Sequence, residues 1–595
     1  MRRAGPARRF PLSAALIALA PAAALAEMPP GVTHFTLQNG MEAVVIEDHR
    51  APVVVQMVWY RIGSADEEPG KTGLAHYLEH LMFKGTDTMA PGELSRTVTA
   101  NGGMDNAFTS YDFTAYFQRI AADRLPLVMR MEADRMANLQ IGEDDWQAER
   151  QVVLEERAQR TDSDPAALFG EEVSAVQFYN HPYGNPVIGW RHEMMGLTRE
   201  DALAWYDEHY APNAAVLVVA GDVTPEQVRA LAQEHYGAIP AKPSADRDAR
   251  PQEPVQRTER RVQMTDPRVP QPVLSRGVIA PERNPGDQKT AAALAVLADL
   301  LGGPSQTSVL GKSLMLTGKA VYAGARYNGL SVDPTTFSLT VVPAPGVSQE
   351  ETEAMLAETV AQFLADGPDP DALERVRTRL RADRIYERDS AHGRAYDYGQ
   401  GLSIGLTVED VNDWPEILAA VTAEDVMNAA RLVLDGQPGV TSWLLPEPGA
   451  AVAQAGDAPV QIPAGQIATA DDGGAAPVAA DAAAMPDAAE AASESSSEAA
   501  AASDSPAAGE ADLLQPLSET REAPPAAAAT DSSGAAAAPR PTPIGSERPR
   551  QRSGQPSDPT AASLTDTPTP DNPAPPDPVV TPEDSSATIQ PEPQP

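Results

Sequence analysis

The sequence predicts an α+β protein of two similar units, each a mostly antiparallel sheet with helices packed on it, followed by a disordered C-terminal tail. The chain of 595 residues is too long for a single hydrophobic core, so at least two domains are expected. Strand and helix patterns alternate, and the same order of strands and helices occurs twice along the chain. A polar, charged and proline-rich segment separates the two occurrences and is typical of a linker.

The N-terminus has the pattern of an export signal. Four arginines among the first nine residues precede an apolar run, and "ALAE" offers a small-residue cleavage site after Ala26. The alternative is an uncleaved membrane anchor, but the apolar core is short and rich in alanine for a span. We therefore predict a cleaved signal peptide over 1–26 and a periplasmic or secreted mature chain without a transmembrane span.

The first unit is predicted over 27–240. "FTLQNGMEAVVIED" alternates apolar residues around Asn39-Gly40, which indicates a β-hairpin. "APVVVQMVWY" and "AAVLVVAGDV" have the continuous apolar pattern of buried strands. Helices are predicted over 76–84, 92–101, 123–138, 144–159 and 224–236.

A linker is predicted over 241–260 and the second unit over 261–447. In the second unit "PVLSRGVIAP" and "TTFSLTVVPAPG" are predicted strands, and "QKTAAALAVLADLLGG" is a predicted helix. Ser348 and Glu351 form a capping-box pattern that predicts the start of another helix. A long helix is expected from Asp369 to about Ser390.

Composition limits the functional classes that remain. Over 448–595 the chain is rich in Ala, Pro, Ser, Thr and acidic residues and has no aromatic residue, so it cannot bury enough apolar surface to fold. The net charge of −39 argues against nucleic acid as a partner, although much of it lies in this tail. The chain contains no cysteine, so any metal must be held by histidines and carboxylates.

The stretch "GLAHYLEHLMFKGT" carries the first candidate site. His76 and His80 are four residues apart and share a helix face, and Glu79 points nearly the same way. Two neutral imidazoles suit Zn²⁺, and H-x-x-E-H reverses the H-E-x-x-H motif, in which the glutamate is a general base. The alternative is that two histidines merely occur on one helix.

A catalytic zinc needs a third protein ligand, and "ERQVVLEERAQR" offers candidates. Glu149 and Glu156 are seven residues apart and lie on one helix face. One of them can bind a metal while the other orients a ligand from outside the coordination shell. The alternative is an exposed acidic helix surface, but two valines within the run suggest a helix packed on a core.

Three motifs in order resemble the pitrilysin/insulinase family of zinc peptidases: "GLAHYLEHLMFKGT", "NGGMDNAFTSYDFTAYF" and "ERQVVLEE". The likeness covers roughly 31–445 and is greatest to short bacterial members and the mitochondrial processing peptidase β subunit. It implies one zinc per chain, bound by His76, His80 and Glu156. It further implies that Glu79 is the catalytic general base and that Glu149 lies behind the ligands.

The resemblance also implies a substrate-binding strand. "GGMDNAFTSYDFTAYF" alternates like a hairpin, and Asn106, Ala107 and Phe108 match the edge strand that pairs with extended substrate in the family. An ordinary hairpin is the alternative.

The sequence departs from the family pattern in the second unit. Active members carry an arginine and a tyrosine that contact the substrate carbonyl. Here Tyr322 matches the catalytic tyrosine, Met315 stands where the arginine belongs, and Arg326 is a possible substitute. The departure suggests a partner: a homodimer, or a heterodimer with a related peptidase-like subunit.

The leading hypothesis is a secreted zinc endopeptidase that acts on peptides or unfolded protein segments. One alternative is a non-catalytic relative that serves as an assembly or chaperone subunit, but such relatives typically lose the metal motif. A scaffold that binds through its acidic tail is a further alternative, which the lack of aromatic residues in the tail disfavours.

Overall fold

The structure is a computed structural model that describes residues 31–448, apart from 244–246 and 388. All of these residues belong to one compact unit. The predicted signal peptide, and the predicted tail from residue 449 onward, lie outside the described residues. No helix in the described ranges is both long and apolar enough to cross a membrane.

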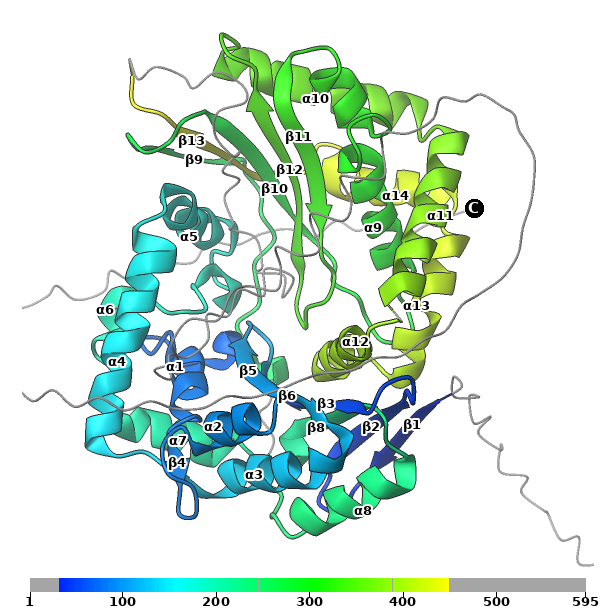
Figure 1. The fold of residues 1–595 in the computed structure, drawn as a ribbon. Helices are drawn as coiled ribbons and strands as arrows, with labels where there is room; N and C mark the ends of the chain where they lie inside the picture. The colour runs from blue at the N-terminus through cyan, green and yellow to red at the C-terminus, as the bar shows by residue number, and fades with distance from the viewer. Residues whose placement is uncertain (1–30, 244–246, 388, 449–595) are drawn as a thin grey trace, which may run out of the picture. The chain divides into compact units, whose positions relative to one another are not determined.

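Six strands of the described chain form the first sheet in the order β1-β2-β8-β3-β6-β5 (Figure 1). The predicted hairpin at Asn39-Gly40 is confirmed, because β1 and β2 pair in antiparallel register. β5 and β6 also pair antiparallel, and β5 is an edge strand. The strands are β1 (Val32–Thr36), β2 (Glu42–Glu47), β3 (Val53–Tyr60), β5 (Met104–Thr109), β6 (Thr114–Ala121) and β8 (Ala215–Gly221).

The second sheet repeats the topology of five of the six strands of the first, all but β1. Its order is β11-β12-β10-β13-β9, with β9 and β13 parallel and the other neighbours antiparallel. In the first sheet β2 and β8 are likewise the parallel pair, and the strands beyond them follow in the same order and directions. The predicted α+β class with two mostly antiparallel sheets is therefore confirmed. The strands are β9 (Arg260–Thr265), β10 (Val273–Ala280), β11 (Ala320–Tyr327), β12 (Thr335–Pro343) and β13 (Val440–Leu445); a separate short pair is β4 (Gly85–Thr86) and β7 (Leu139–Gln140).

Helices of the N-terminal half cover one face of the first sheet. Apolar residues from alternate positions of the strands, such as Val54 and Val58, meet helix residues such as Leu78 and Val128 in one buried core. The apolar face of these strands therefore packs against a layer of helices, as a two-layer core requires. The helices of this half are α1 (Leu74–Leu81), α2 (Glu93–Ala100), α3 (Leu125–Asn138), α4 (Glu143–Arg157), α5 (Pro165–Gln177), α6 (Arg191–Met194), α7 (Arg199–His209) and α8 (Pro225–His235).

Helices of the C-terminal half cover one face of the second sheet in the same way, around a core that includes Leu297, Phe337 and Trp443. The predicted capping box is confirmed, since Ser348 accepts from the Glu351 amide and the Glu351 side chain accepts from Ser348. The helices are α9 (Lys289–Gly302), α10 (Gln349–Asp366), α11 (Pro370–Glu387), α12 (Ala391–Ser403), α13 (Val408–Ala420) and α14 (Ala423–Leu434).

One helix from each half packs on the sheet of the other half. α12 lies across the second face of the first sheet and contacts β3 and β8 (Figure 1). Gly399 allows this close approach, because a Cβ there would lie 2.0 Å from Trp59 Nε1. In turn, α5 of the N-terminal half packs Phe169 and Val173 against Leu444 of the second sheet. Neither sheet is therefore buried by its own half alone.

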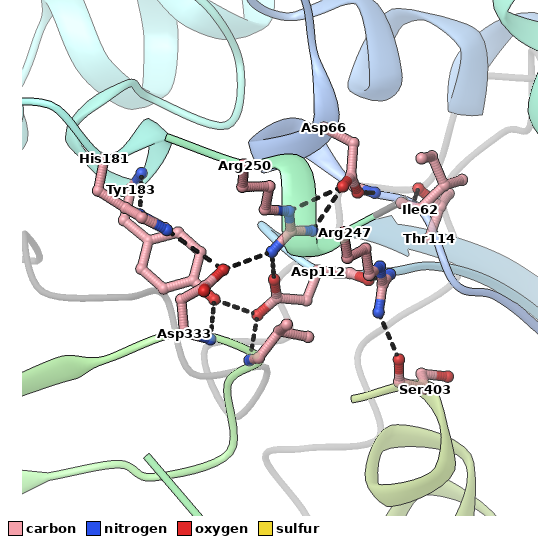
Figure 2. A network of polar contacts seen from close by, with 12 residues as sticks. Ile62, Asp66, Asp112, Thr114, His181, Tyr183, Arg247, Arg250, Asp333 and Ser403 are labelled. Atoms are coloured by element: carbon pink, nitrogen blue, oxygen red, sulfur yellow. Dashed lines mark hydrogen bonds and ion pairs between the residues drawn. The ribbon is translucent and has the colours of Figure 1, made fainter. Parts of the chain in front are cut away.

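A buried polar network also joins the halves at the predicted linker. Arg250, 7% exposed, contacts Asp66 at 2.7 Å, Asp112 at 2.7 Å and Asp333 at 3.0 Å. Figure 2 shows its guanidinium pointing among these three carboxylates. The Tyr183 hydroxyl donates to Asp112 at 2.6 Å and accepts from the Asp333 amide at 3.2 Å. Asp66 and Asp112 belong to the N-terminal half and Asp333 to the C-terminal half, so the network is an interface between them.

Two further side chains extend this network. Arg247 donates to the carbonyl oxygen of Ser403 at 2.8 Å and also to that of Asp112. His181 Nε2 lies 3.2 Å from Asp333 (Figure 2). Arg247 is part of a short 3₁₀ helix, Arg247–Ala249. The described part of the predicted linker is thus packed into the fold by its arginines.

Candidate metal centre

α1 places its polar residues on one face by the ordinary helical spacing. The helix starts after Gly73, whose φ of 87° lies in the left-handed region that favours glycine. Glu67 accepts from the amides of Gly73 at 2.9 Å and Ala75 at 2.8 Å, which satisfies two free donors of the first turn. Tyr77 and Leu78 are buried in the core, which leaves His76, Glu79 and His80 directed toward one side.

α4 is held against α1 by an aromatic pair. The rings of Tyr77 and Trp146 stack with centroids 4.2 Å apart, and the Tyr77 hydroxyl donates to the Trp146 carbonyl at 2.5 Å. Trp146 begins the second turn of α4, and Glu149 and Glu156 follow along the same helix. The packing of this pair brings the two glutamates to the polar face of α1.

His76, His80 and Glu156 converge at one point. Their ligand atoms all lie within 4.8 Å of one another. Glu156 Oε2 is 3.2 Å from His80 Nε2 and 3.6 Å from His76 Nε2. The two imidazole rings are 4.8 Å apart, in edge-on orientation. Two nitrogens and one oxygen are the donor set of a catalytic zinc.

These residues fit a metal ion on the structure's own evidence. Glu156 Oε2 is buried and has no hydrogen bond of regular geometry; its polar neighbours are His80 Nε2 at 3.2 Å and His76 Nε2 at 3.6 Å. Buried polar atoms are normally satisfied, so an oxygen left in this state calls for a further partner. A divalent cation bound between the three ligand atoms would supply that partner.

Burial and neighbouring charges shift the pKa values of all three residues of the cluster. Burial and the neighbouring His80 lower the pKa of His76 to about 4, which leaves a neutral imidazole. Burial also acts to lower the pKa of His80, but contacts with Glu149 and Glu156 outweigh it and raise the value to about 10. Burial acts to raise the pKa of Glu156, yet the two histidines and Arg160 lower it to about 2.

Glu149 lies behind the His80 ring, on the side away from Glu156. Its Oε1 is 2.9 Å from His80 Nδ1, and its other oxygen contacts the Lys84 ammonium. Burial acts to raise the pKa of Glu149, but His80 and Lys84 hold it below its usual range. A carboxylate on the rear nitrogen of a histidine fixes the ring and leaves the other nitrogen for a metal.

Glu79 stands beside the cluster but is not one of its converging groups. It is 6% exposed, and its Oε2 accepts a hydrogen bond of 2.5 Å from Thr109 Oγ1. Burial raises the pKa of Glu79 to about 7, while His80 and the Thr109 hydrogen bond oppose this rise. A buried carboxylate next to a metal site has the position that a general base needs.

The sequence prediction missed three residues of this site. Arg160 contacts Glu156 Oε1 at 2.9 Å from one helical turn away, and the spacing of four could have revealed it. Lys84 contacts Glu149, which lies on a different helix, so its contact has no such local signal. Thr109 is thirty residues from Glu79 and lies on a different element, so no local pattern points to it.

The predicted substrate strand is β5, whose outer edge pairs with no other strand of the described chain. Ala107 is buried in the core beneath α1. Phe108 points to the opposite face, where its ring lies 5.2 Å from Trp59 and 5.6 Å from Tyr396. Asn106 Oδ1 accepts from the Ala107 amide at 3.0 Å. The side chains of Ala107 and Phe108 are thus committed to packing within the fold.

The predicted residues of the second unit lie on β11 and on the short helical segment before it. Tyr322 is half-buried in β11 and packs with the cluster that includes Phe169 of α5. Met315 ends a short π-helical segment and packs against the core of the C-terminal half. Arg326 is exposed and, four residues along β11, shares the strand face of Tyr322. Among the described residues, neither Tyr322 nor Arg326 forms a hydrogen bond or ion pair with His76, His80 or Glu156.

Comparison with protein families agrees with this geometry. Residues 43–190 match the model described as "Insulinase (Peptidase family M16)", and residues 196–380 match "Peptidase M16 inactive domain". Together the two matches cover more than half of the chain. The chain belongs to peptidase family M16. The predicted resemblance to insulinase-type peptidases is therefore confirmed.

Relatives of this M16 chain include proteins named zinc proteases and a processing-peptidase subunit. The zinc protease PqqE of Helicobacter pylori is 35% identical over 205 residues, which is 34% of this chain and 46% of that protein. The probable mitochondrial-processing peptidase subunit beta of Arabidopsis thaliana is 24% identical over 404 residues, 67% of this chain and 74% of its own. With the first of these relatives, the chain spans about half of the relative's length.

Solved structures show the same M16 fold. A protease from Helicobacter pylori superposes with a TM-score of 0.66 at 26% identity and covers 71% of this chain and all of its own. The periplasmic protease PqqL of Escherichia coli superposes with a TM-score of 0.61 at 19% identity, covering 72% of this chain and 50% of its own. At that identity the second likeness concerns the fold alone.

Proposed function

We propose that this M16 chain is a secreted zinc endopeptidase that hydrolyses peptides or unfolded protein segments. The observation that carries the proposal is the convergence of His76, His80 and Glu156 around an unsatisfied buried oxygen, with Glu79 beside them. Relatives named zinc proteases support the same chemistry.

Each residue has a distinct task in this proposal. His76, His80 and Glu156 would hold one zinc ion, and Glu149 would orient His80 from behind. When bound, zinc supplies a Lewis acid that lowers the pKa of water toward 7 and polarises a carbonyl group. Glu79 would accept the proton of the attacking water and return one to the leaving amine.

The free edge of β5 supports an extended polypeptide as substrate. A peptide that adds to this edge would form main-chain hydrogen bonds with the backbone of residues 104–109. Because β5 also contacts α1, such a peptide would run past the metal cluster. Backbone recognition of this kind suits unfolded segments, since a folded protein rarely offers a free strand.

Metal content tests the ligand assignment directly. We expect about one zinc per chain in the purified protein, as for other three-ligand catalytic sites. His76→Ala, His80→Ala and Glu156→Gln should each lose the zinc, measured by elemental analysis. Glu155→Gln is the matched control, because Glu155 is exposed and lies outside the cluster, and it should keep the metal. Full zinc occupancy in Glu156→Gln would show that another residue is the third ligand.

Incubation with a mixed peptide library, with and without chelator, then tests hydrolysis. Chelator-sensitive cleavage read by mass spectrometry supports the endopeptidase. Zinc binding without cleavage would favour the alternative of a non-catalytic assembly subunit.

We further infer that a related subunit completes the site. Met315 packs against the core of the C-terminal half and offers no cation, so a developing oxyanion lacks the family's arginine. We expect the isolated chain to be a slow peptidase. A related subunit with the arginine–tyrosine pair should raise the rate roughly 10²- to 10³-fold, the usual effect of one oxyanion donor. Fast turnover by the isolated chain that survives Tyr322→Phe but not Arg326→Met would assign the role to Arg326 instead.

Export is part of the proposal. The basic and apolar start of the chain supports a cleaved signal peptide. N-terminal sequencing of the mature protein from the periplasmic and extracellular fractions would test it, with Glu27 expected as the first residue. An intact N-terminus in the membrane fraction would favour the anchor.

A further inference from the structure

Thr109 connects the edge strand to the carboxylate beside the metal cluster. Among the described residues, its hydroxyl supplies the hydrogen bond that holds the Glu79 side chain, at 2.5 Å. Thr109 is the last residue of β5, and Glu79 lies in the last turn of α1. The contact therefore joins two elements that differ in function under the proposal above, one that binds substrate and one that moves a proton.

Strand alternation explains why Thr109 faces Glu79. Asp105, Ala107 and Thr109 share one face of β5. Ala107 on that face is buried beneath α1, and Asp105 accepts from Ser95 of α2 at 2.6 Å. The opposite face is occupied by Phe108 in its aromatic cluster. The strand is thus clamped on both faces, which leaves Thr109 little freedom to turn away from α1.

The chain after Thr109 is anchored as well. The Ser110 carbonyl accepts from the Ser64 amide at 3.0 Å, and the Tyr111 carbonyl accepts from the Ala65 amide at 2.9 Å. Across the hairpin, Thr109 is in register with Thr114. The end of β5 is therefore a rigid support for a hydrogen bond.

A glutamate needs such a support to act as a base. Its terminal torsion is broad, so an unrestrained carboxylate samples many orientations. A hydrogen bond to Oε2 fixes the plane and leaves Oε1 to receive a proton. Misplacement of a catalytic group by about 1 Å can cost roughly 10²-fold in rate.

We propose that Thr109 is a positioning residue that holds the Glu79 carboxylate in its productive orientation and ties that orientation to the substrate-binding edge of β5. The inference rests on the proposed peptidase function. It deepens that function, because the end of the substrate-binding strand then sets the orientation of the carboxylate that acts as the base.

The test uses the full chain loaded with zinc. Thr109→Val keeps the shape and removes the donor, and it should lower kcat roughly 10- to 100-fold with KM and zinc content unchanged, as expected for a hydrogen bond to a charged group. Thr109→Ser retains the hydroxyl and should recover most of the rate. In a Glu79→Gln background, Thr109→Val should cost little more, because both residues act through one group.

Thr114→Val is the matched control. Thr114 is buried on the neighbouring strand and donates to the Ile62 carbonyl at 3.0 Å (Figure 2), so this variant also removes a buried threonine donor but leaves Glu79 untouched. Its kcat should stay near that of wild type. An equal fall in kcat for Thr109→Val and Thr114→Val, or no rescue by Thr109→Ser, would overturn the inference.

Crystal structures of the Thr109→Val and Thr109→Ser proteins separate this inference from the proposed function. The Glu79 carboxylate should be displaced in the valine variant and retained in the serine variant. An unmoved carboxylate in Thr109→Val would refute the positioning role whether or not the chain is a peptidase. Zinc-loaded wild-type protein that cleaves no peptide would instead refute the peptidase, while the displaced carboxylate would still be observed.

Discussion

Glu79→Gln is expected to keep its zinc and lose most of its activity, about 10²- to 10⁴-fold in rate, the usual cost of removing a general base. Glutamine has the same shape, and its amide oxygen can still accept from Thr109. The amide has no basic oxygen to take a proton from water. Because Glu79 is not one of the three converging groups, which are His76, His80 and Glu156, metal binding should not change.

Zinc content and steady-state kinetics of the same preparation measure the two effects together. Glu155→Gln makes the same chemical change at an exposed position of α4 and should behave like wild type in both measurements. Loss of zinc from Glu79→Gln would make Glu79 a ligand. Near-normal turnover would mean that another residue is the base.

Arg250→Met is expected to destabilise the fold by about 3–5 kcal/mol, the usual cost of breaking a buried ion pair from one side. The guanidinium contacts Asp66, Asp112 and Asp333, and its loss would leave three carboxylates close together (Figure 2). Because these carboxylates come from both halves, the halves should also lose part of their mutual attachment. Thermal unfolding and limited proteolysis of the linker measure the two consequences.

Arg261→Met is the control for this experiment. The Arg261 side chain is 57% exposed and pairs with Glu353, so its loss should cost at most about 1 kcal/mol. Adding Asp112→Asn and Asp333→Asn to Arg250→Met should restore part of the stability, because these changes remove the uncompensated charge. Equal melting temperatures for Arg250→Met and wild type would show that the network contributes nothing to folding.

The sequence by itself determined the features that depend on neighbours along the chain. His76, Glu79 and His80 share a face because a helix brings residues three and four apart together, and this holds wherever the helix lies. Glu149 and Glu156 share a face of α4 for the same reason. The hairpin at Asn39-Gly40 is likewise local, since it follows from the turn residues and alternation. The duplicated order of strands and helices could be predicted because the local patterns of strands and helices recur in the same order in each half.

Only the tertiary structure decided which of these faces meet. Residues distant in sequence carry no periodic signal, so nothing in the chain pairs Thr109 with Glu79 or gathers three aspartates around Arg250. α12 contains three glycines and would be a poor helix alone; packing on the first sheet, with Gly399 against Trp59, compensates for that weak propensity. Helical geometry thus set which residues share a face of α1 and of α4, whereas long-range packing brought those two faces together, placed Thr109 beside Glu79 and joined the two halves.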